Sequence, residues 1–400
     1  IGDAFTDTEF QDIIARAYSG FGHAARAPLK QLAPGHFLLE LFHGPTLAFK
    51  DFAMQLIGQM FEASLTRSGT RVSIVGATSG DTGSAAIEAF RGLESVDVFI
   101  LYPQGRVSEV QRRQMTTPTE RNVHALAIDG DFDAAQARVK DMFNDFAFRD
   151  EVRLAGVNSI NWARVLAQVV YYFTAAVSLG APDRKVSFTV PTGNFGDIFA
   201  GYIARAMGLP IDRLVVATNR NDILHRCLTT GEYRPDGVVP TISPSMDIQV
   251  SSNFERALFY AYGQEGAAVA QLMDELKAGG FTVSQGALQA LREVLISGRA
   301  DEDATRATIR DTYEATGELL CPHSAVGVHV AEAQRDPRVP MITLATAHPA
   351  KFPDAVEAAT GLHPPLPARM ADLYDRDERL TRVADDLPTI ETLIKERIAH

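Results

Sequence analysis

The chain has 400 residues, of which 46% are hydrophobic and 22% are charged, so it is long enough to bury the cores of two or three globular domains. Its formal net charge of −12 argues against a general nucleic-acid binder and against a protein that binds anionic membranes, although a pocket can still hold a few cations for an anionic small substrate. Two cysteines, Cys227 and Cys321, provide neither a disulfide framework nor a metal-ligand set, and no apolar run reaches the roughly 18 residues of a membrane span, so we expect a cytoplasmic protein without a metal.

The first unusual stretch is HGPTLAFKDF, residues 43–52, which places a lysine inside an apolar segment. Lysine is rarely buried without a partner. Lys50 therefore either reaches water beside Asp51, or it is held inside because its amine is needed there. The residue pattern alone leaves these two interpretations open.

Short β-branched segments, each followed by a turn and a helical pattern, make up much of the chain. This alternation predicts βαβ units around parallel sheets. The region 220–320 has helical stretches with few strand signals, and we interpret it as a helical insertion; the charged last thirty residues predict a solvated terminal helix. The expected strands are 71–75, 96–103, 122–129, 185–191, 213–219 and 341–347.

GATSGDTG, residues 76–83, lies where a strand should end and a helix should begin. Its glycines let the backbone turn tightly, and the first turn of the helix then presents N–H groups to an anion. Thr78, Ser79 and Thr82 add hydroxyl groups. A cluster that only caps the helix explains the same residues, and both interpretations stay open.

PTGNFGD, residues 191–197, has the same layout after a second strand, with two glycines and an amide before a helix. It matches neither the P-loop nor the GxGxxG pattern. Two such loops together indicate a ligand site between domains, at the carboxyl ends of parallel strands.

Two further segments carry candidate residues. NSINWAR, residues 158–164, places Ser159 near a helix start and Arg164 about one turn later, and arginine suits bidentate phosphate contact. Taken alone, a capping serine with an exposed arginine is the favoured interpretation. In TAHPAKF, residues 346–352, Thr346 follows an apolar strand, although a turn at Pro349 explains this segment equally well.

These motifs occur together and in a characteristic order: LFHGPTLAFKDF, ATSGDTG, YPQGRVS, IDGDFDAAQ, NSINWAR, PTGNFGD and TAHPAKF. The set resembles the threonine synthases, in the branch found in proteobacteria and fungi, over most of the chain; the first forty residues and 225–320 match only loosely. The resemblance implies an enzyme of fold type II that depends on pyridoxal 5'-phosphate (PLP), in the tryptophan synthase β-like class, with two parallel-sheet αβα domains and a helical insertion. It also implies that O-phospho-L-homoserine and water are converted to L-threonine and phosphate.

The resemblance further implies roles for individual residues. Lys50 would be the catalytic lysine that forms the Schiff base with PLP, and Thr346 would donate a hydrogen bond to the pyridine nitrogen. The cofactor phosphate would bind to Gly193, Asn194, Phe195, Gly196 and Asp197. The substrate carboxylate would bind to Thr78, Ser79, Asp81 and Thr82, and the substrate phosphate to Ser159 and Arg164 with help from Thr82 and Asn194, while Asn158 would also contact the substrate. Asp81 would in addition face the cofactor ring, where many relatives carry asparagine.

The domains expected from this resemblance are an N-terminal segment over 1–70 that leads into the lysine helix, a smaller mobile αβ domain over 71–152, and a large cofactor-binding domain over 153–400. We expect residues 71–150 to move when substrate binds, because closure excludes water from the site. The chain begins with Ile1 rather than Met, which indicates a piece of a longer protein. The expected binding partner is the small-molecule substrate, and we expect the protein itself to be a monomer or a homodimer.

Other functions remain as alternatives. Another fold type II enzyme, such as a phospho-lyase or a serine/threonine dehydratase, would use a similar lysine and cofactor loop. A dehydratase needs no second phosphate site, so Ser159 and Arg164 favour the synthase. A non-catalytic PLP-binding protein is the third alternative, and the presence of Lys50 argues against it.

Overall fold

The computed structural model describes residues 2–398. Contacts divide the chain into two units, of which unit 1 comprises the chain up to residue 26, residues 43–158 and the chain from residue 365, and unit 2 comprises residues 27–42 and 159–364. These units differ from the expected boundaries, because the helix that begins at Lys50 groups with 71–152 and the last part of the chain returns to the same unit. The expected mobile domain stays a prediction.

Unit 1 is built on a sheet with the strand order β13–β5–β4–β3–β6, and all of its neighbouring strands run parallel. Its helices are α1 (Asp7–Tyr18), α2 (Lys50–Ser68), α3 (Asp81–Phe90), α4 (Glu109–Thr116), α5 (Phe132–Asn144), α6 (Phe146–Glu151) and α16 (Leu387–Arg397). Its strands are β3 (Val72–Ala77), β4 (Val96–Pro103), β5 (Val123–Ile128), β6 (Leu154–Ala155) and β13 (Thr381–Val383).

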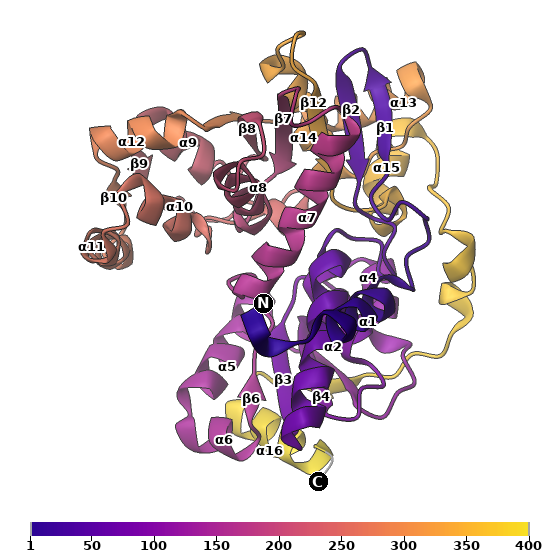
Figure 1. Ribbon diagram of the computed structural model, residues 1–400. Helices are drawn as coiled ribbons and strands as arrows, with labels where there is room; N and C mark the ends of the chain where they lie inside the picture. The colour runs from indigo at the N-terminus through magenta and orange to yellow at the C-terminus, as the bar shows by residue number, and fades with distance from the viewer. Residues whose placement is uncertain (1, 399–400) are drawn as a thin grey trace. The chain divides into compact units, whose positions relative to one another are not determined.

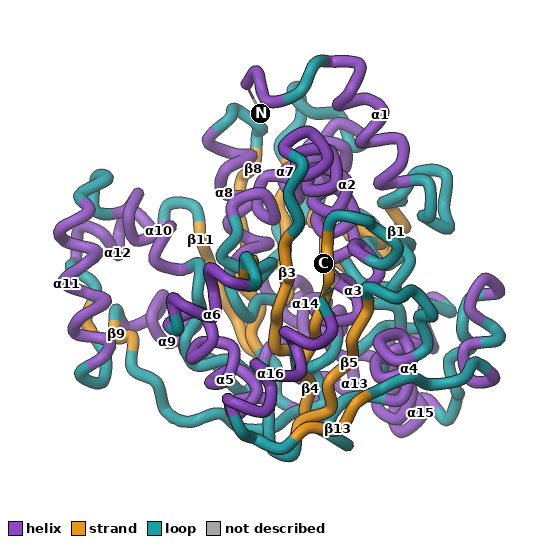
Figure 2. Tube along the Cα trace, turned by 90° about the horizontal axis from the view of Figure 1, so that it is seen from below, coloured by secondary structure: helices purple, strands orange, loops and turns teal. Residues whose placement is uncertain are grey.

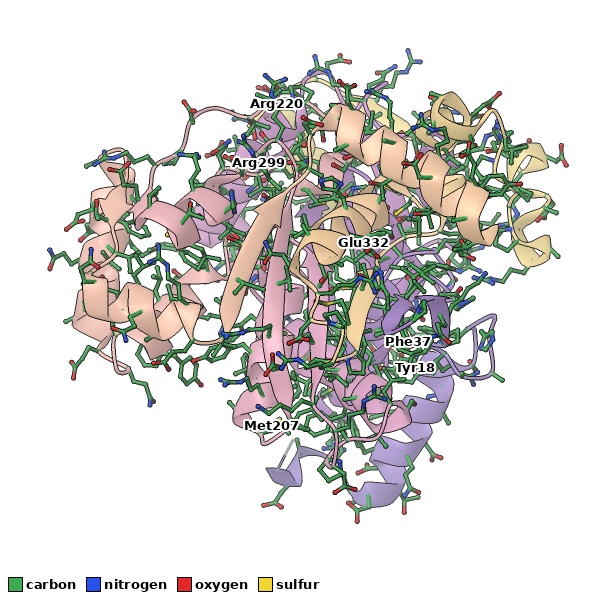
Figure 3. All side chains as sticks on the ribbon, turned by 90° about the horizontal axis from the view of Figure 1, so that it is seen from above. Tyr18, Phe37, Met207, Arg220, Arg299 and Glu332 are labelled. Carbon is green, nitrogen blue, oxygen red and sulfur yellow. The ribbon has the colours of Figure 1, made fainter. Side chains whose placement is uncertain are left out.

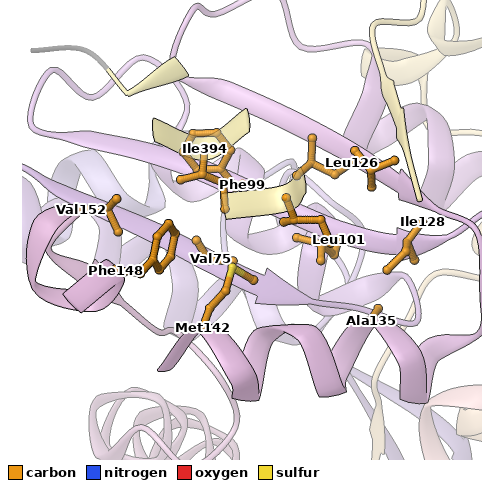
Figure 4. Packing of buried hydrophobic residues seen from close by; sticks show 12 residues of the cluster. Val75, Phe99, Leu101, Leu126, Ile128, Ala135, Met142, Phe148, Val152 and Ile394 are labelled. Carbon is orange, nitrogen blue, oxygen red and sulfur yellow. The ribbon is translucent and has the colours of Figure 1, made fainter. Parts of the chain in front are cut away.

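Both faces of this sheet are covered by helices, which explains why every residue of β4 is buried. Side chains alternate between the two faces of a strand. On one face Phe99 and Leu101 pack with Met142 of α5 and Ile394 of α16, as Figure 4 shows. On the other face, Ile100 lies against α3, where a Cβ on Gly83 would come within 2.8 Å of it. Figure 2 shows β3, β4, β5 and β13 running side by side.

Unit 2 contains a sheet with the order β1–β2–β12–β7–β8–β11, in which only the β1–β2 pair among these neighbours is antiparallel. Its helices are α7 (Trp162–Ser178), α8 (Gly196–Ala206), α9 (Ile223–Thr230), α10 (Phe254–Ala261), α11 (Gly266–Lys277), α12 (Gln285–Arg292), α13 (Glu302–Thr316), α14 (Pro322–Gln334) and α15 (Pro353–Thr360). Its strands are β1 (Leu29–Ala33), β2 (His36–Glu40), β7 (Val186–Pro191), β8 (Ile211–Thr218), β9 (Glu232–Tyr233), β10 (Phe281–Thr282), β11 (Leu295–Arg299) and β12 (Met341–Ala345).

Polar contacts fix the outer parts of the unit 2 sheet. His36 of β2 lies between Glu332 of α14, at 2.7 Å from its Nδ1, and Thr343 of β12, at 2.8 Å from its Nε2. Arg299 at the end of β11 donates to Asp222 at 2.7 Å. Figure 3 labels Glu332 and Arg299 at these positions, and Figure 1 shows α9 to α12 grouped around the small β9–β10 ribbon.

The predicted strands are all present, and the region 220–320 is largely helical as expected. Two expectations about elements were wrong. Residues 295–299, inside the region expected to be a helical insertion, form β11 and pair with β8, a partner that lies about eighty residues earlier in the chain and that no local pattern shows. The C-terminal stretch is not a solvated helix throughout: residues 381–383 form β13 on β5, and Ile390 and Ile394 of α16 are buried.

Candidate active site

Lys50 lies at the first position of α2, and a tight turn before it directs the chain into the helix. Leu47 in this turn has a φ of 64°, a left-handed conformation that is rare for a bulky residue and is often found at functional sites. The Asp51 carboxylate accepts hydrogen bonds from the Thr46 N–H at 2.8 Å and from the Thr46 hydroxyl at 2.6 Å, which holds the turn closed. A Cβ on Gly44 would lie 2.4 Å from that carboxylate, so the turn requires glycine there.

The amine of Lys50 faces the loop at the start of α3. Its Nζ lies 3.5 Å from Oδ2 of Asp81, and the two side chains are 11% and 5% exposed. The Nζ also lies 4.6 Å from the ring centroid of Phe49. Lys50 is thus a buried lysine beside a buried carboxylate, which settles that it does not simply extend into water beside Asp51.

Gln111 of α4 fixes the other oxygen of Asp81. Its Nε2 donates to Oδ1 of Asp81 at 2.9 Å, while its Oε1 accepts from the Ser108 N–H at 3.1 Å. Each end of the Gln111 amide therefore has a hydrogen-bond partner. A Cβ on Gly80 would collide with this amide at 2.4 Å, and Gly80 has a φ of 139°. Glycine at position 80 therefore allows Gln111 to reach Asp81.

The hydroxyl of Thr78 organises the rest of this loop. It accepts hydrogen bonds from the N–H groups of Gly80, at 2.9 Å, and Gly83, at 2.8 Å. This geometry matches the capping alternative for Thr78, while its own hydroxyl hydrogen stays available to a ligand. Ser79 is exposed and Thr82 is partly exposed, so both are accessible.

In unit 2 the loop 193–197 leads from β7 into α8, which begins at Gly196. The N–H groups of the first helical turn have no partner within the helix and are suited to bind an anion. Phe195 precedes the helix with a φ of 63°, and a Cβ on Gly193 would approach the Ser245 carbonyl oxygen to 2.7 Å. The Asp197 carboxylate accepts hydrogen bonds from Tyr171 and Tyr172 of α7, so its side chain anchors α8 to α7.

Hydrogen bonds from the segment 251–253 hold the loop 193–197 in place. Ser251 donates to the Gly193 carbonyl at 2.7 Å, and Ser252 donates to Oδ1 of Asn194 at 3.1 Å. The Asn253 Nδ2 donates to the main-chain oxygens of Asn194 and Ser159, both at 3.0 Å. The loop 193–197 and the start of α7 are therefore held together by one short segment.

The expected residues of the phosphate site differ in burial. Ser159 is partly exposed and its Oγ lies 3.0 Å from Oγ of Ser252, whereas Asn158 is exposed. Arg164 is only 5% exposed, and burial lowers the pKa of its guanidinium to about 10, so it stays charged at neutral pH. Arg164 is thus not the exposed arginine that the segment alone favoured. Thr346 is buried directly after β12, at the carboxyl end of that strand.

Comparison with known proteins identifies the family. The family model for pyridoxal-phosphate-dependent enzymes matches residues 24–271, and the model for the C-terminal region of threonine synthase matches residues 324–394. The threonine synthase of Pseudomonas aeruginosa is 53% identical over 99% of this chain and 85% of its own length. The chain belongs to the threonine synthase family.

Solved structures extend this comparison. The crystal structure of PLP-bound threonine synthase from Brucella melitensis has a TM-score of 0.95 and 57% sequence identity, and the match covers 98% of this chain and 84% of that one. A PLP-dependent aspartate racemase, 11% identical with a TM-score of 0.58, shares the fold. The resemblance seen in the sequence is confirmed, and so is the fold of the type II PLP enzymes.

The residues of this chain fit PLP, the cofactor after which this enzyme class is named. A buried lysine amine is available for the aldehyde carbon, and the loop 193–197 before α8 offers main-chain donors to a phosphate. Gly193 packs so closely on the Ser245 carbonyl that a side chain there would displace the loop. Thr346 provides a neutral hydroxyl, which suits an unprotonated ring nitrogen.

Sequence reasoning missed Gln111, Ser252 and Asn253. A capping box at Ser108 and Gln111 was a recognisable signal, since it follows the YPQG turn, but the contact with Asp81 depends on the tertiary fold. Among residues 2–398 no helix is long and apolar enough to cross a membrane, and no cluster of acidic, histidine and cysteine side chains is arranged to hold a metal.

Proposed function

We propose that this PLP-dependent enzyme converts O-phospho-L-homoserine and water to L-threonine and phosphate. The observation that supports the proposal is that Ser159, just before α7, is linked through Ser252 to Asn194 of the cofactor loop, while Arg164 lies in the first turn of α7. We infer that Ser159, Asn194 and Arg164 form a second phosphate site. A dehydratase, whose substrate bears no phosphate, has no use for this set. The loop 193–197 would bind the cofactor phosphate through main-chain N–H groups, because the Asp197 carboxylate already accepts from two tyrosines.

When bound, PLP withdraws electrons from the α-carbon of the substrate. Lys50 would act as the base that removes the proton from Cα and later a proton from Cβ, and as the acid that returns a proton to Cγ after phosphate has left. Asp81, 3.5 Å from Nζ, would stabilise the ammonium form of Lys50 between these transfers. Thr78, Ser79 and Thr82 would hold the substrate carboxylate at the start of α3.

The leaving phosphate would be received by Ser159, Arg164 and Asn194. Arginine is suited to this step because its charge is permanent and its donors match two phosphate oxygens. Water must then add its oxygen at Cβ while a proton returns to Cα, and the carbon skeleton leaves as threonine. Early release of the carbon skeleton, before water has added at Cβ, would give α-ketobutyrate instead, so a closed site with controlled access of water is part of the function.

We also propose that the enzyme works in the cytoplasm as a monomer or homodimer, with the small substrate as its partner and without nucleic acid or a membrane. The buried free thiols of Cys227 and Cys321 suit a reducing compartment.

A product assay tests the proposal. Purified enzyme supplied with PLP and O-phospho-L-homoserine should release L-threonine and inorganic phosphate in a one-to-one ratio. Phosphate released together with α-ketobutyrate, and without threonine, would identify a phospho-lyase. Deamination of L-serine or L-threonine without any action on O-phospho-L-homoserine would identify a dehydratase.

A further inference from the structure

Three helices of unit 2, α7, α8 and α10, begin near Ser159 and Asn194, the residues that the proposed function assigns to the substrate phosphate. Asn161 caps α7, Phe195 precedes α8, and Asn253 precedes α10. Hydrogen bonds from the segment 252–253 connect the residues just before α7 and α8. The proposed function uses Ser159 and Asn194 but assigns no task to the segment between them.

The direction of the hydrogen bonds at Ser252 follows from its single hydroxyl hydrogen. Ser252 donates to Oδ1 of Asn194 at 3.1 Å, so it can only be an acceptor toward the Ser159 hydroxyl, which lies at 3.0 Å. The Ser159 hydroxyl can rotate, so its hydrogen can turn from Ser252 to a phosphate when the substrate binds. With Oδ1 of Asn194 occupied, the Nδ2 end of the amide remains as the donor. The amide nitrogen is the end that a phosphate requires, because an amide oxygen would repel the anion.

The backbone around Ser252 is held rigidly. Arg256 donates to Oδ1 of Asn253 at 3.1 Å, which leaves Nδ2 of Asn253 to donate to the carbonyl groups of Asn194 and Ser159. Arg256 also donates to the Ile160 carbonyl at 2.8 Å. The Asn253 N–H adds a further hydrogen bond to the Asn194 carbonyl at 3.0 Å. Ser252 therefore has a fixed position from which its hydroxyl can orient the Asn194 side chain.

We propose that Ser252 is a positioning residue for recognition of the substrate phosphate, which it serves by fixing the Asn194 amide with its nitrogen available to the phosphate and by linking that amide to Ser159. This inference rests on the proposed function and deepens it. Without the Ser252 hydroxyl, the amide of Asn194 is free to rotate and to present its oxygen to the anion. The effect is specific to ligands of the substrate-phosphate site, because the cofactor loop keeps the hydrogen bonds that its main-chain oxygens accept from Ser251 and Asn253.

The test compares, in the same variants, ligands that use the substrate-phosphate site with ligands that do not. In Ser252→Ala holoenzyme we expect the KM for O-phospho-L-homoserine to rise about five- to tenfold, the effect of one lost hydrogen bond of ordinary strength. The inhibition constant of inorganic phosphate should rise by a similar factor. The binding of L-threonine and of PLP, each followed by absorbance of the cofactor, should stay within about twofold. Ser252→Thr keeps the hydroxyl and should restore both phosphate-dependent constants.

Ser178→Ala is the matched control, because Ser178 is an exposed serine of α7 that donates to the Thr174 carbonyl, away from the start of the helix. It should leave all four constants unchanged. The inference is overturned if Ser252→Ala weakens L-threonine or PLP as much as phosphate, which would indicate a general role in the fold, or if none of the constants changes. Calorimetry measures the dissociation constant of inorganic phosphate for the wild-type and Ser252→Ala holoenzymes without any turnover. This measurement still tests the role of Ser252 if the enzyme forms no threonine and the proposed function fails.

Discussion

Gln111 is the residue that most directly controls how Asp81 faces Lys50. Its amide donates to one Asp81 oxygen at 2.9 Å and accepts from the Ser108 N–H, while the other Asp81 oxygen lies 3.5 Å from Nζ of Lys50. We expect Gln111→Ala to lower kcat/KM about ten- to hundredfold, because a hydrogen bond to a charged group contributes roughly 1.5–3 kcal/mol. Steady-state kinetics of threonine formation measure this effect.

The control for Gln111 is Gln104, an exposed glutamine in the YPQG turn that precedes the same helix. Gln104→Ala should change neither kcat/KM nor stability noticeably, since exposed substitutions usually stay within about 0.5 kcal/mol. Equal kinetics for Gln111→Ala and the wild type would show that Asp81 does not need this amide.

His124 on β5 predicts a pH dependence of stability. Burial, and then the charge of Arg397, lowers its pKa to about 4; its ring stacks on Phe99 at 4.4 Å. Since its pKa is lower in the folded than in the unfolded chain, its neutral form stabilises the fold above about pH 6.5, and this contribution is lost as the pH falls toward 4. We expect the loss to reach about 2 kcal/mol, less than the full shift implies because the ring is partly exposed.

The comparison variant is His124→Phe, which keeps the stacking and cannot be protonated. Urea unfolding between pH 4 and pH 7 should show the wild type losing stability relative to this variant as the pH falls. Parallel curves for the two proteins would contradict the lowered pKa.

The sequence led to Lys50 but not to its environment. A lysine within an apolar stretch is visible in one segment, and the family motifs identify its role. Its partner Asp81 lies 31 residues away, and the amide of Gln111 that orients Asp81 lies 30 residues further on. Ser252 is 93 residues from Ser159. No local pattern encodes such contacts, because they exist only once the strands have paired.

Among elements, α16 offers the clearest test of the fold. Ile390 and Ile394 are fully buried against the sheet of unit 1, with Phe99 and Phe148 in the same cluster (Figure 4). We expect Ile394→Ala to lower the free energy of unfolding by about 2–4 kcal/mol, the usual cost of such a truncation in a core. Leu380→Ala is the control, since Leu380 is 40% exposed and should cost less than about 0.5 kcal/mol.

Urea titrations followed by circular dichroism measure both variants. Equal losses for Ile394→Ala and Leu380→Ala would show that α16 does not belong to this core. The sequence predicted the helix but not its burial, because charged residues dominate the stretch before it and only two of its apolar side chains, four residues apart, are fully buried.

Most inner strands were predicted from the sequence, with the exception of β2, whereas the edge strands were missed. The apolar runs that form β4, β7 and β12 were recognised, whereas β1, β11 and β13 lie at the edges of their sheets. The exposed residues of β1 weaken its apolar pattern, and β13 has only three residues. Edge strands need less hydrophobic surface, so the sequence marks them weakly.

At the scale of the whole molecule, the expected movement of residues 71–150 on substrate binding stays a prediction. Closure would shield the reaction from water and so favour threonine over α-ketobutyrate. Crystal structures of the free enzyme and of a complex with a substrate analogue would measure it. Identical positions of 71–150 in the two crystals would contradict the prediction.

The most direct test of the central claim, that Lys50 is the reactive lysine of a PLP enzyme, is borohydride reduction of the holoenzyme followed by peptide mass spectrometry. Reduction fixes PLP on the lysine that holds it, and we predict that the added mass maps to the peptide containing Lys50. The same mass on another lysine, such as the buried Lys351, or on none, would contradict the account.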